Sequence, residues 1–415
     1  MCEMKEPVIR FKGYTDEWEQ RKLSDIVGVM DGDRGKNYPT EADFSEQGHT
    51  LFLNASNVTN QGFVFNDTQF ITEDKSNSMG NGKLQIDDIV LTSRGSLGHI
   101  AWYNAAVMNQ VPYARINSGM LILRKKSDVN TSYIHQYMKS AKGQGQISFM
   151  SFGSAQPQLT KKGVEGLKVQ FPNDLAEQEK LGDYFATLDN LITLHQRKCD
   201  DLQEVKKYML QKLFPQNGAK IPEIRFAGFT GEWEQRKLGD VFQEYSEKRH
   251  EELPPLTIIQ GGGTILREES DRNLQYDKSS LSNYKMVKKD DFIVHLRSFE
   301  GGLEKANSDG IISPAYHTLH GDNTDSRFYY PFFRSRRFIE VLLKPHVYGI
   351  RDGKSIDIEG MKTINIPVPS LKEQQRIGEY IENIDDLIAL QQRCCDNLKE
   401  VKKFMLQNMF PEGWK

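Results

Sequence analysis

The sequence is poor in cysteine, and its few cysteines are not arranged for metal binding or for a disulfide framework. Among 415 residues only four are cysteine, namely Cys2, Cys199, Cys394 and Cys395. None of them forms a CxxC pair, and no cysteine–histidine cluster has the spacing of a zinc site. Cys199 and Cys395 fall at equivalent points on the apolar stripes of two predicted helices. We therefore expect both to be small buried residues rather than redox centres.

Long apolar runs are also missing. No stretch approaches the roughly 18 residues that mark a membrane-spanning helix, and the N-terminal segment MCEMKEPVIRF has no apolar signal-peptide core. These absences predict a cytoplasmic protein that does not bind a membrane. With 38% hydrophobic and 27% charged residues, the composition is that of an ordinary globular chain. Its length allows two or three domains.

The chain has no excess of basic residues. It contains 54 lysines and arginines against 57 aspartates and glutamates, which gives a formal net charge of −3. A protein that holds nucleic acid by bulk electrostatics usually has a strongly basic face. The overall balance argues against binding of that kind and leaves local basic grooves possible.

Sequence motifs of catalysis are absent. We find no Walker phosphate loop, no GxSxG, no HExxH and no dinucleotide-binding GxGxxG in a strand–turn–helix frame. The glycines at 261–263 favour a flexible turn over a phosphate cradle. Asp88 and Asp291, each preceded by another aspartate, could be acids of a metal-dependent nuclease. Each opens a predicted strand after a turn, however, where aspartate is common, so we interpret the chain as a binder without a cofactor or metal of its own.

The most informative feature present is an internal repeat. Residues 9–26 read IRFKGYTDEWEQRKLSDI and residues 224–241 read IRFAGFTGEWEQRKLGDV, with 13 of 18 positions identical at an offset of 215. Residues 177–215 match residues 373–411 at an offset of 196, with 22 of 39 positions identical. Between these constant blocks sequence similarity nearly vanishes. A purely structural repeat would be expected to repeat its middle as well, so we interpret the two variable middles as two versions of one function.

Each of the longer constant blocks predicts a long helix. The segments Asp174-Leu-Ala-Glu177 and Ser370-Leu-Lys-Glu373 fit the capping box, in which the first side chain accepts a backbone N–H and the glutamate reaches back. A proline closes each block, because proline cannot continue the helical hydrogen bonds. At 1.5 Å per residue, a helix of this size is about 58 Å long.

Apolar residues recur along both predicted helices at alternating spacings of four and three, the pattern of a coiled-coil seam. His195 and Gln391 interrupt the seam at the same place. Because glutamine cannot perform acid–base chemistry, we interpret both as polar residues that set the register. A pseudo-two-fold axis between the modules would pair the helices antiparallel, as a spacer. The seam residues expected in this spacer are Leu181, Leu188, Ile192, His195, Leu202, Ile377, Ile384, Ile388, Gln391 and Leu398.

The variable middles predict mixed α and β structure. Alternating apolar residues predict strands at 88–92, 119–124, 292–296 and 363–368, and helical patterns occur at 131–140 and 327–343. The predicted fold class is α+β, with two globular α/β domains separated by two long antiparallel coiled-coil helices in a pseudo-two-fold repeat. The predicted boundaries are 1–171 and 216–368 for the domains, and 172–215 and 369–415 for the helices.

Side chains that can read DNA bases occur at matching places in the two middles. Arg94 and Arg297 each follow six residues after a strand-opening aspartate. Arginine can bond guanine through two hydrogen bonds, and asparagine or glutamine can do the same with adenine. For any single residue, the alternative of a solvated loop position remains open. The candidate DNA-binding residues are Arg94, Ser96, Asn109, Gln110, Tyr113, Gln156, Lys161, Lys162, Arg297, Ser298, Tyr316, Tyr348, Arg351 and Lys354.

Over essentially its whole length the chain resembles the specificity subunits of type I restriction–modification enzymes. The resemblance rests on the two helical blocks that begin with Glu-Gln, and on SFGSAQPQLTKKGVEGLKV near the end of the first middle. It implies that each variable domain is a target recognition domain reading one half of a split, asymmetric DNA site, and that the paired helices set the spacing. It also implies binding to double-stranded DNA, to two modification subunits that carry S-adenosylmethionine, and to restriction subunits that use ATP and Mg.

Two other functions remain as alternatives. The paired seams and the acidic helices would also suit a structural coiled-coil scaffold without sequence-specific DNA binding. A nuclease with a dispersed acidic site around Asp88 and Asp291 is the second alternative.

Overall fold

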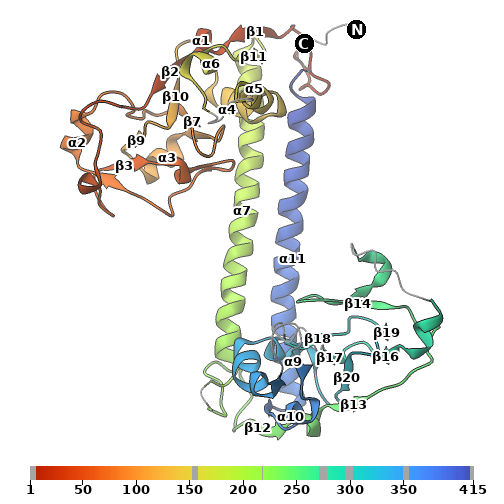
Figure 1. The fold of residues 1–415 in the computed structure, drawn as a ribbon. Helices are drawn as coiled ribbons and strands as arrows, with labels where there is room; N and C mark the ends of the chain where they lie inside the picture. Colours follow the sequence, from red (N-terminus) through yellow and green to blue (C-terminus); the bar gives the residue numbers. More distant parts are fainter. Residues whose placement is uncertain are drawn as a thin grey trace. The chain divides into compact units, whose positions relative to one another are not determined.

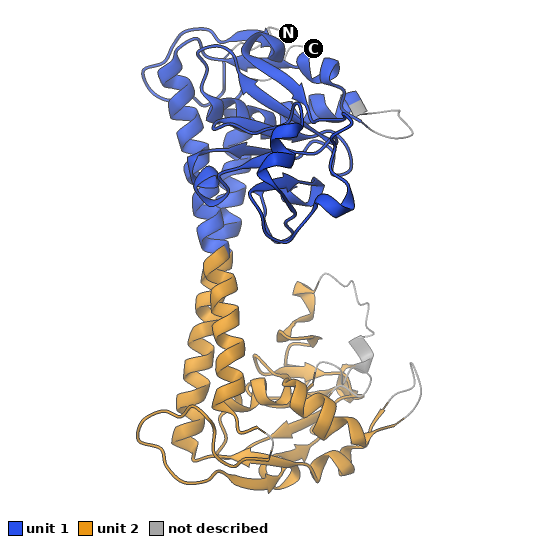
Figure 2. Cartoon of the chain, turned by 90° about the vertical axis from the view of Figure 1, so that its left-hand side faces the viewer, with its two compact units in different colours: residues 1–196, 393–415 blue, residues 197–392 orange. Residues whose placement is uncertain are grey.

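The structure, a computed structural model, describes residues 6–151, 158–216, 218–270, 278–294, 302–348 and 355–411. The chain forms two compact units, which are residues 1–196 with 393–415, and residues 197–392 (Figure 2). Each unit contains one globular α/β domain and one half of each long helix. The predicted fold class is therefore confirmed.

The first unit is built on a four-stranded antiparallel sheet (Figure 1). Its strands, in spatial order, are β2 (Val27–Asp31), β10 (Met120–Lys125), β7 (Asp88–Thr92) and β8 (Ile100–Tyr103). A three-stranded sheet has the order β6 (Phe70–Ile71), β3 (Thr50–Leu53) and β9 (Ala114–Ile116), with β3 and β9 parallel. Two antiparallel pairs complete the strands, β1 (Glu19–Lys22) with β11 (Lys168–Phe171) and β4 (Val58–Thr59) with β5 (Gly62–Phe63).

Short helices connect these strands. They are α1 (Leu23–Ile26), α2 (Glu73–Ser78), α3 (Ala105–Gln110), α4 (Thr131–Lys139), α5 (Ala141–Ser151) and α6 (Lys161–Glu165), with 3-10 turns at Glu41–Asp43 and Ala55–Asn57. The strand predicted at 88–92 and the helix predicted at 131–140 are confirmed to within one residue.

The second unit repeats the same four-stranded sheet. Its strands, in spatial order, are β13 (Gln243–Tyr245), β20 (His317–His320), β17 (Phe292–Val294) and β18 (Glu304–Lys305). The outer pairs are β12 (Glu234–Lys237) with β23 (Asn365–Val368), β14 (Leu256–Ile259) with β15 (Gly263–Leu266), β16 (Lys285–Val287) with β19 (Gly310–Ile312), and β21 (Val347–Tyr348) with β22 (Ser355–Ile356). The four-stranded sheet of the middle is thus repeated although its sequence is not, in agreement with the predicted pseudo-two-fold repeat.

The helices of the second domain are α8 (Leu238–Val241), α9 (Ser326–Phe333) and α10 (Ile358–Lys362), with 3-10 turns at Arg267–Glu269, Lys278–Asn283 and Lys344–His346. The helical pattern predicted at 327–343 is split into α9 and a π-helix at Phe338–Leu343. Pro331 lies inside α9. Since proline cannot donate a backbone hydrogen bond and crowds the preceding turn, a single regular helix over this stretch is disfavoured.

The two long helices are α7 (Leu175–Leu213, 39 residues) and α11 (Leu371–Asn408, 38 residues). They run antiparallel in each unit. In the first unit Lys402 Nζ lies 2.5 Å from Asp189 Oδ1, and in the second unit Lys206 of α7 pairs with Asp385 of α11. No helix among the described residues is long and apolar enough to cross a membrane.

The residues of the predicted seam differ in burial. Leu181, Leu188, Ile377 and Ile384 are buried. Cys199 and Cys395 are also buried, at 2% and 1% exposure, which confirms their assignment as small core residues. The remaining predicted seam residues are half-buried, and these are Ile192, His195, Leu202, Ile388, Gln391 and Leu398.

The constant blocks are joined to one another by a buried ion pair that occurs once in each unit. Arg10 Nε donates to Glu177 Oε1 at 2.7 Å, and Arg225 Nε donates to Glu373 Oε1 at 2.7 Å. The capping-box prediction was therefore only partly correct. Asp174 does accept a backbone N–H, from Ala176, but the glutamate carboxylates are bound by arginine, which forms stronger charge-assisted bonds than a backbone amide.

The neighbouring glutamine of each block also has a fixed role. Gln178 donates to the carbonyl of Pro172 and accepts from the N–H of Asn130, which caps α4. Gln374 donates to Pro369 and accepts from Asp325, the cap of α9. The Glu-Gln pair therefore attaches the start of each long helix to its own domain. This explains why these two residues recur unchanged in both blocks.

Candidate nucleic-acid interface

In the first domain several loops meet at one end of the four-stranded sheet. The loop after β7 is attached to the turn before β10, because the N–H groups of Ser93 and Arg94 both donate to the carbonyl of Gly119 at 2.8 and 3.2 Å. A third segment joins them through Leu159 N–H and Ser93 O at 3.0 Å. Arg34, from the loop after β2, donates to Ser118 O at 3.2 Å. We call this arrangement the loop cluster.

A buried arginine orders the adjoining loop at 76–82. Arg115 is 2% exposed and donates to the carbonyls of Ser76, Gly80 and Asn81 at 2.7, 2.5 and 2.8 Å. Burial lowers the pKa of the Arg115 guanidinium. The hydrogen bonds to three carbonyl groups offset part of the free-energy cost of burying this guanidinium, and they fix the loop at a definite position.

Asp33 connects the loop after β2 to the same segment. It accepts from the N–H of Gly35 at 2.7 Å and from the N–H of Gly80 at 2.8 Å, and these backbone hydrogen bonds lower the pKa of its carboxyl. The close approach also requires glycine at 32, where a Cβ atom would lie 2.1 Å from Asn117 O. The loop cluster is therefore held mainly by backbone and buried groups, with the exposed Arg34 side chain adding one hydrogen bond to Ser118 O.

The exposed side chains of the loop cluster are of types that can read bases. Arg94 and Ser96, both predicted from sequence, are exposed here. Sequence reasoning missed three further exposed residues of the cluster, Arg34, Lys36 and Asn81. No local sequence signal marks them, since tertiary contacts of Asp33 and Arg115 bring their loops to this end of the sheet.

Three other predicted residues lie elsewhere in the domain. Asn109 and Gln110 are exposed in the last turn of α3, and Tyr113 stacks on His49 with ring centroids 4.1 Å apart. Tyr113 precedes β9, whereas the loop cluster follows it. At about 3.3 Å per residue the intervening strand separates the two sites by roughly 13 Å. The structure thus divides the predicted residues between two ends of β9.

The lysines predicted near the end of the domain are on the side of the loop cluster. Lys161 and Lys162 are exposed at the start of α6, directly after the segment whose Leu159 binds Ser93. Lys161 also lies 3.9 Å from Glu165. Gln156 lies outside the described residues.

In the second domain Tyr316 is at the corresponding end of the sheet. It immediately precedes β20, whose His317 pairs with Val294 at the end of β17. Tyr316 is half-buried, and burial raises the pKa of its hydroxyl. Tyr348, on β21, is 60% exposed. The other predicted residues of this domain, Arg297, Ser298, Arg351 and Lys354, lie outside the described residues.

The aspartates considered for a nuclease are engaged within the fold. Asp88 is fully buried and accepts two hydrogen bonds from Arg124, at 2.7 and 2.6 Å. Asp291 is 1% exposed and binds Tyr245 and His320. Across the described residues no group of three or more histidine, cysteine, aspartate or glutamate side chains could hold a metal ion. These contacts support a structural role for both aspartates.

The long helices carry a second kind of surface, an exposed apolar patch in each unit. Helical periodicity puts these residues roughly a third of a turn from the seam. The first helix patch is Leu191, Leu194, Val401 and Phe404, exposed by 38, 47, 46 and 55%. The second helix patch is Val205, Tyr208, Leu387 and Leu390, exposed by 45, 52, 46 and 46%. At the offset of 196 the two patches occupy equivalent positions.

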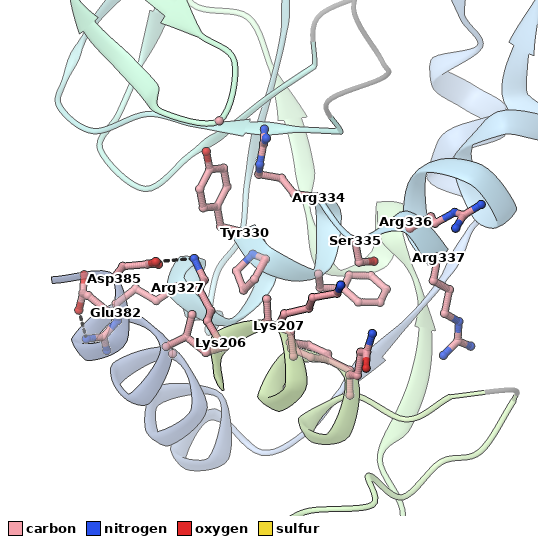
Figure 3. A pocket seen from close by; sticks show the side chains of 18 of the residues that line it. Lys206, Lys207, Arg327, Tyr330, Arg334, Ser335, Arg336, Arg337, Glu382 and Asp385 are labelled. Atoms are coloured by element: carbon pink, nitrogen blue, oxygen red, sulfur yellow. Dashed lines mark hydrogen bonds and ion pairs between the residues drawn. The ribbon is translucent and has the colours of Figure 1, made fainter. Parts of the chain in front are cut away.

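The second unit also contains a concavity of about 900 Å³ (Figure 3). It is lined by α9 with the turn that follows it, and by residues from the second half of α7 and the first half of α11. Seven of its lining residues are lysine or arginine, whereas two are acidic.

Comparisons with known proteins agree on one family. The family model described as "Type I restriction modification DNA specificity domain" matches residues 15–204 and 230–400. The chain is 22% identical over 418 residues to the type I restriction enzyme MjaVIII specificity subunit of Methanocaldococcus jannaschii, covering 94% of this chain and 91% of that protein. It is 21% identical over 403 residues, with the same coverage, to a protein of that archaeon named as an MjaX specificity subunit.

A solved structure has a similar fold. The S subunit of a type I restriction–modification system from M. genitalium matches with a TM-score of 0.64 at 13% identity, covering 99% of this chain and 100% of that one. The two matched regions each span one globular domain and much of the long helix that follows it. The chain therefore belongs to the family of type I restriction–modification DNA specificity subunits, and it carries two recognition domains.

Proposed function

We propose that this chain reads a bipartite, asymmetric DNA target for a type I restriction–modification complex, with one half-site for each variable domain. The observation that carries the proposal is the four-stranded sheet, which has the same strand order in both domains although the sequences of the two middles are unrelated. A shared framework holds each reading surface, and different loop side chains present different hydrogen-bonding groups to DNA. Two different half-sites follow from this arrangement.

The loop cluster is the reading surface that we propose for the first domain. Arg94 and Arg34 supply guanidinium groups that can bond guanine, and Asn81 supplies an amide that can bond adenine. Lys161 and Lys162 suit contacts to phosphate, which position a protein on DNA without reading its sequence. By topological equivalence, Tyr316, which directly precedes β20, belongs to the reading surface that we propose for the second domain.

Methylome sequencing of a host that carries the assembled complex tests this division. Arg94→Ala should relax or abolish recognition in one half-site and leave the other half-site and the spacing intact, at about 1–3 kcal/mol per lost bidentate contact. Tyr113→Ala, at the other end of β9, is the matched control. If Arg94→Ala changed both halves, or if Tyr113→Ala changed the same bases as Arg94→Ala, the assignment would be wrong.

For the partners, we propose two copies of one modification subunit, each docking on one helix patch. Exposed apolar groups gathered on one helix face are typical of protein–protein interfaces. Their pseudo-equivalence supports two identical partners rather than two different ones. Phe404→Asp with Val401→Asp should reduce the bound modification subunits from two to one in native mass spectrometry, as should Tyr208→Asp with Val205→Asp. Loss of both copies with either pair, or of neither, would contradict this stoichiometry.

We further propose that the chain itself is not catalytic, and that S-adenosylmethionine, ATP and Mg are bound by its partners. The buried, paired state of Asp88 and Asp291 supports this. Such a subunit would work in the cytoplasm, where it meets DNA. Divalent-metal-dependent cleavage of DNA by the purified chain would refute the non-catalytic role. A lack of any stoichiometric complex with a co-expressed modification subunit would favour the scaffold alternative.

A further inference from the structure

The concavity of the second unit has a filled counterpart in the first. α4 and α9 are equivalent helices. Asn130 is the N-cap of α4 and Asp325 is the N-cap of α9. The backbone N–H of each cap donates at 3.0 Å to the side-chain oxygen of the glutamine in its Glu-Gln pair. Their chain positions differ by 195. The residues that face the long helices from α4 and α9 can therefore be compared one by one.

In the first unit α4 is bonded directly to the long helices. Gln136 Nε2 donates to Asp189 Oδ2 at 2.9 Å, and Lys139 Nζ lies 3.8 Å from the same carboxylate. Lys402 of α11 lies 2.5 Å from its other oxygen. Burial acts to raise the pKa of Asp189, but the two lysines outweigh it and hold that pKa below its usual value. The space between α4 and α7 is closed by this network.

In the second unit the same bonds cannot form. Pro331 occupies the position of Gln136 and has no side-chain donor. Arg334 occupies the position of Lys139, but its guanidinium pairs with Glu304 of β18. α9 is consequently not drawn onto Asp385, the counterpart of Asp189, and the concavity opens between them. Arg327 reaches Glu382 at 3.1 Å and Lys206 pairs with Asp385, which uses both acidic residues of the lining.

The lining of the concavity also includes basic side chains, among them Lys207, Arg336 and Arg337 (Figure 3). Of the seven basic lining residues, four are ion-paired with a carboxylate, namely Lys206, Lys305, Arg327 and Arg334. The remaining positive charge of the rim is carried by Lys207, Arg336 and Arg337. Among the described residues, no carboxylate forms an ion pair with Lys207 or Arg336. The floor, by contrast, includes apolar side chains from all three helices, among them Leu210, Phe332 and Ile381.

We infer that this concavity binds an acidic polypeptide segment with apolar anchoring side chains, contributed by another protein. A positive rim selects acidic groups by charge complementarity, and an apolar floor favours burial of aliphatic or aromatic side chains. The size, within the usual range for enclosed binding sites, admits a short chain segment. Duplex DNA suits such a floor poorly, because the only apolar groups on its base edges are the thymine methyls. The inference does not depend on the proposed half-site reading.

The consequence is a binding site that is present in one unit of the repeated chain and has no equivalent in the other. The helix patches are equivalent and suit two copies of one partner, whereas this concavity has its counterpart filled by Gln136 and Lys139. One acidic segment per chain would therefore bind, and only in the second unit.

Selection of a random 12-residue phage-displayed peptide library on the full-length chain tests the inference. Peptides that combine several aspartates or glutamates with leucine or phenylalanine should be enriched. Their affinity, measured by fluorescence anisotropy, should fall at least tenfold for the Lys207→Glu, Arg336→Glu variant. Lys403→Glu, the same change at the equivalent exposed position of α11, is the matched control and should leave binding unchanged.

Three results would overturn the inference. The first is that no enriched peptide depends on Lys207 and Arg336. The second is that Lys403→Glu weakens binding to the same extent. The third is that a 12-bp duplex of arbitrary sequence displaces the bound peptide, which would make the concavity a nucleic-acid site. Hydrogen exchange in α9 separates a loss of the site from a loss of folding, because the charge-reversed side chains are at the rim and should leave α9 protected.

Discussion

The buried ion pair between Arg10 and Glu177 gives the most specific prediction about stability. Glu177→Gln removes the charge and one of two acceptor oxygens from a side chain that is 1% exposed, while Arg10 is 12% exposed. Breaking a buried pair by changing one partner typically costs about 3–5 kcal/mol. Because Arg10 keeps its bond to Asp16 O and some access to water, we expect the lower end, about 3 kcal/mol.

The measurement should resolve the two units, since a chain with two compact units has no single two-state free energy of unfolding. Hydrogen exchange with mass spectrometry does so. A loss of about 3 kcal/mol corresponds to roughly 100-fold faster exchange through local opening. That increase should be confined to residues 9–16 and the first turns of α7. Peptides around Arg225 and Glu373 should be unchanged.

The repeat supplies the matched control. Glu373→Gln should accelerate exchange around Arg225 to a similar degree, because that pair has the same 2.7 and 2.8 Å bonds and a glutamate that is 2% exposed. The paired replacement Arg10→Met, Glu177→Leu should recover much of the loss, since it leaves no unpaired buried charge. If either single change affected both units equally, or produced less than about threefold faster exchange, the structural role assigned to the Glu-Gln blocks would be refuted.

Three further predictions concern the first unit. Burial lowers the pKa of His135 from 6.5 to about 3, so the unfolded chain binds a proton that the folded unit does not, and stability present above pH 6.5 should be lost as the pH falls toward 3. His135→Phe should remove that part of the acid sensitivity, as judged by hydrogen exchange at pH 7, 5 and 4, and an unchanged pH profile would contradict the assignment. Asp189→Asn should destabilise the contact of α4 with the long helices by about 3 kcal/mol, because it leaves Lys139 and Lys402 facing each other, and faster exchange in α4 would report it. Arg115→Met should release residues 76–82 at a cost of about 2–4 kcal/mol and relax recognition of the first half-site in methylome sequencing, whereas retained specificity would show that this loop takes no part in reading DNA.

The sequence determined the architecture because its signals for architecture are local and repeated. A seam spaced by four and three residues forces two helices to bury one stripe, and the buried Leu181 and Ile377 follow that pattern. Alternation of apolar residues fixed β7 and β10 in the same way. The identity of two distant blocks indicated a pseudo-symmetric chain before any contact was known.

Only the tertiary structure decided which contacts the repeated residues make. Nothing local to Glu177 or Glu373 favours arginine over the helix's own backbone as partner, because each arginine lies about 150 or more residues away along the chain. The strand order of the repeated sheet was equally hidden, because pairing between strands that lie far apart in the chain leaves no local pattern in the sequence.

The reading surface likewise combines residues that the sequence indicated with residues that only the folded chain brings together. Arg94 could be found from sequence because it follows a strand at a repeated spacing, whereas Arg34 and Asn81 reach the same surface only through Asp33 and Arg115. The concavity likewise arises from two replacements in α9 whose meaning depends on the helices packed against it. Sequence patterns therefore determined which elements form and which face is buried, since these depend on periodicity. The sites depend on contacts between distant segments, which only the folded chain defines.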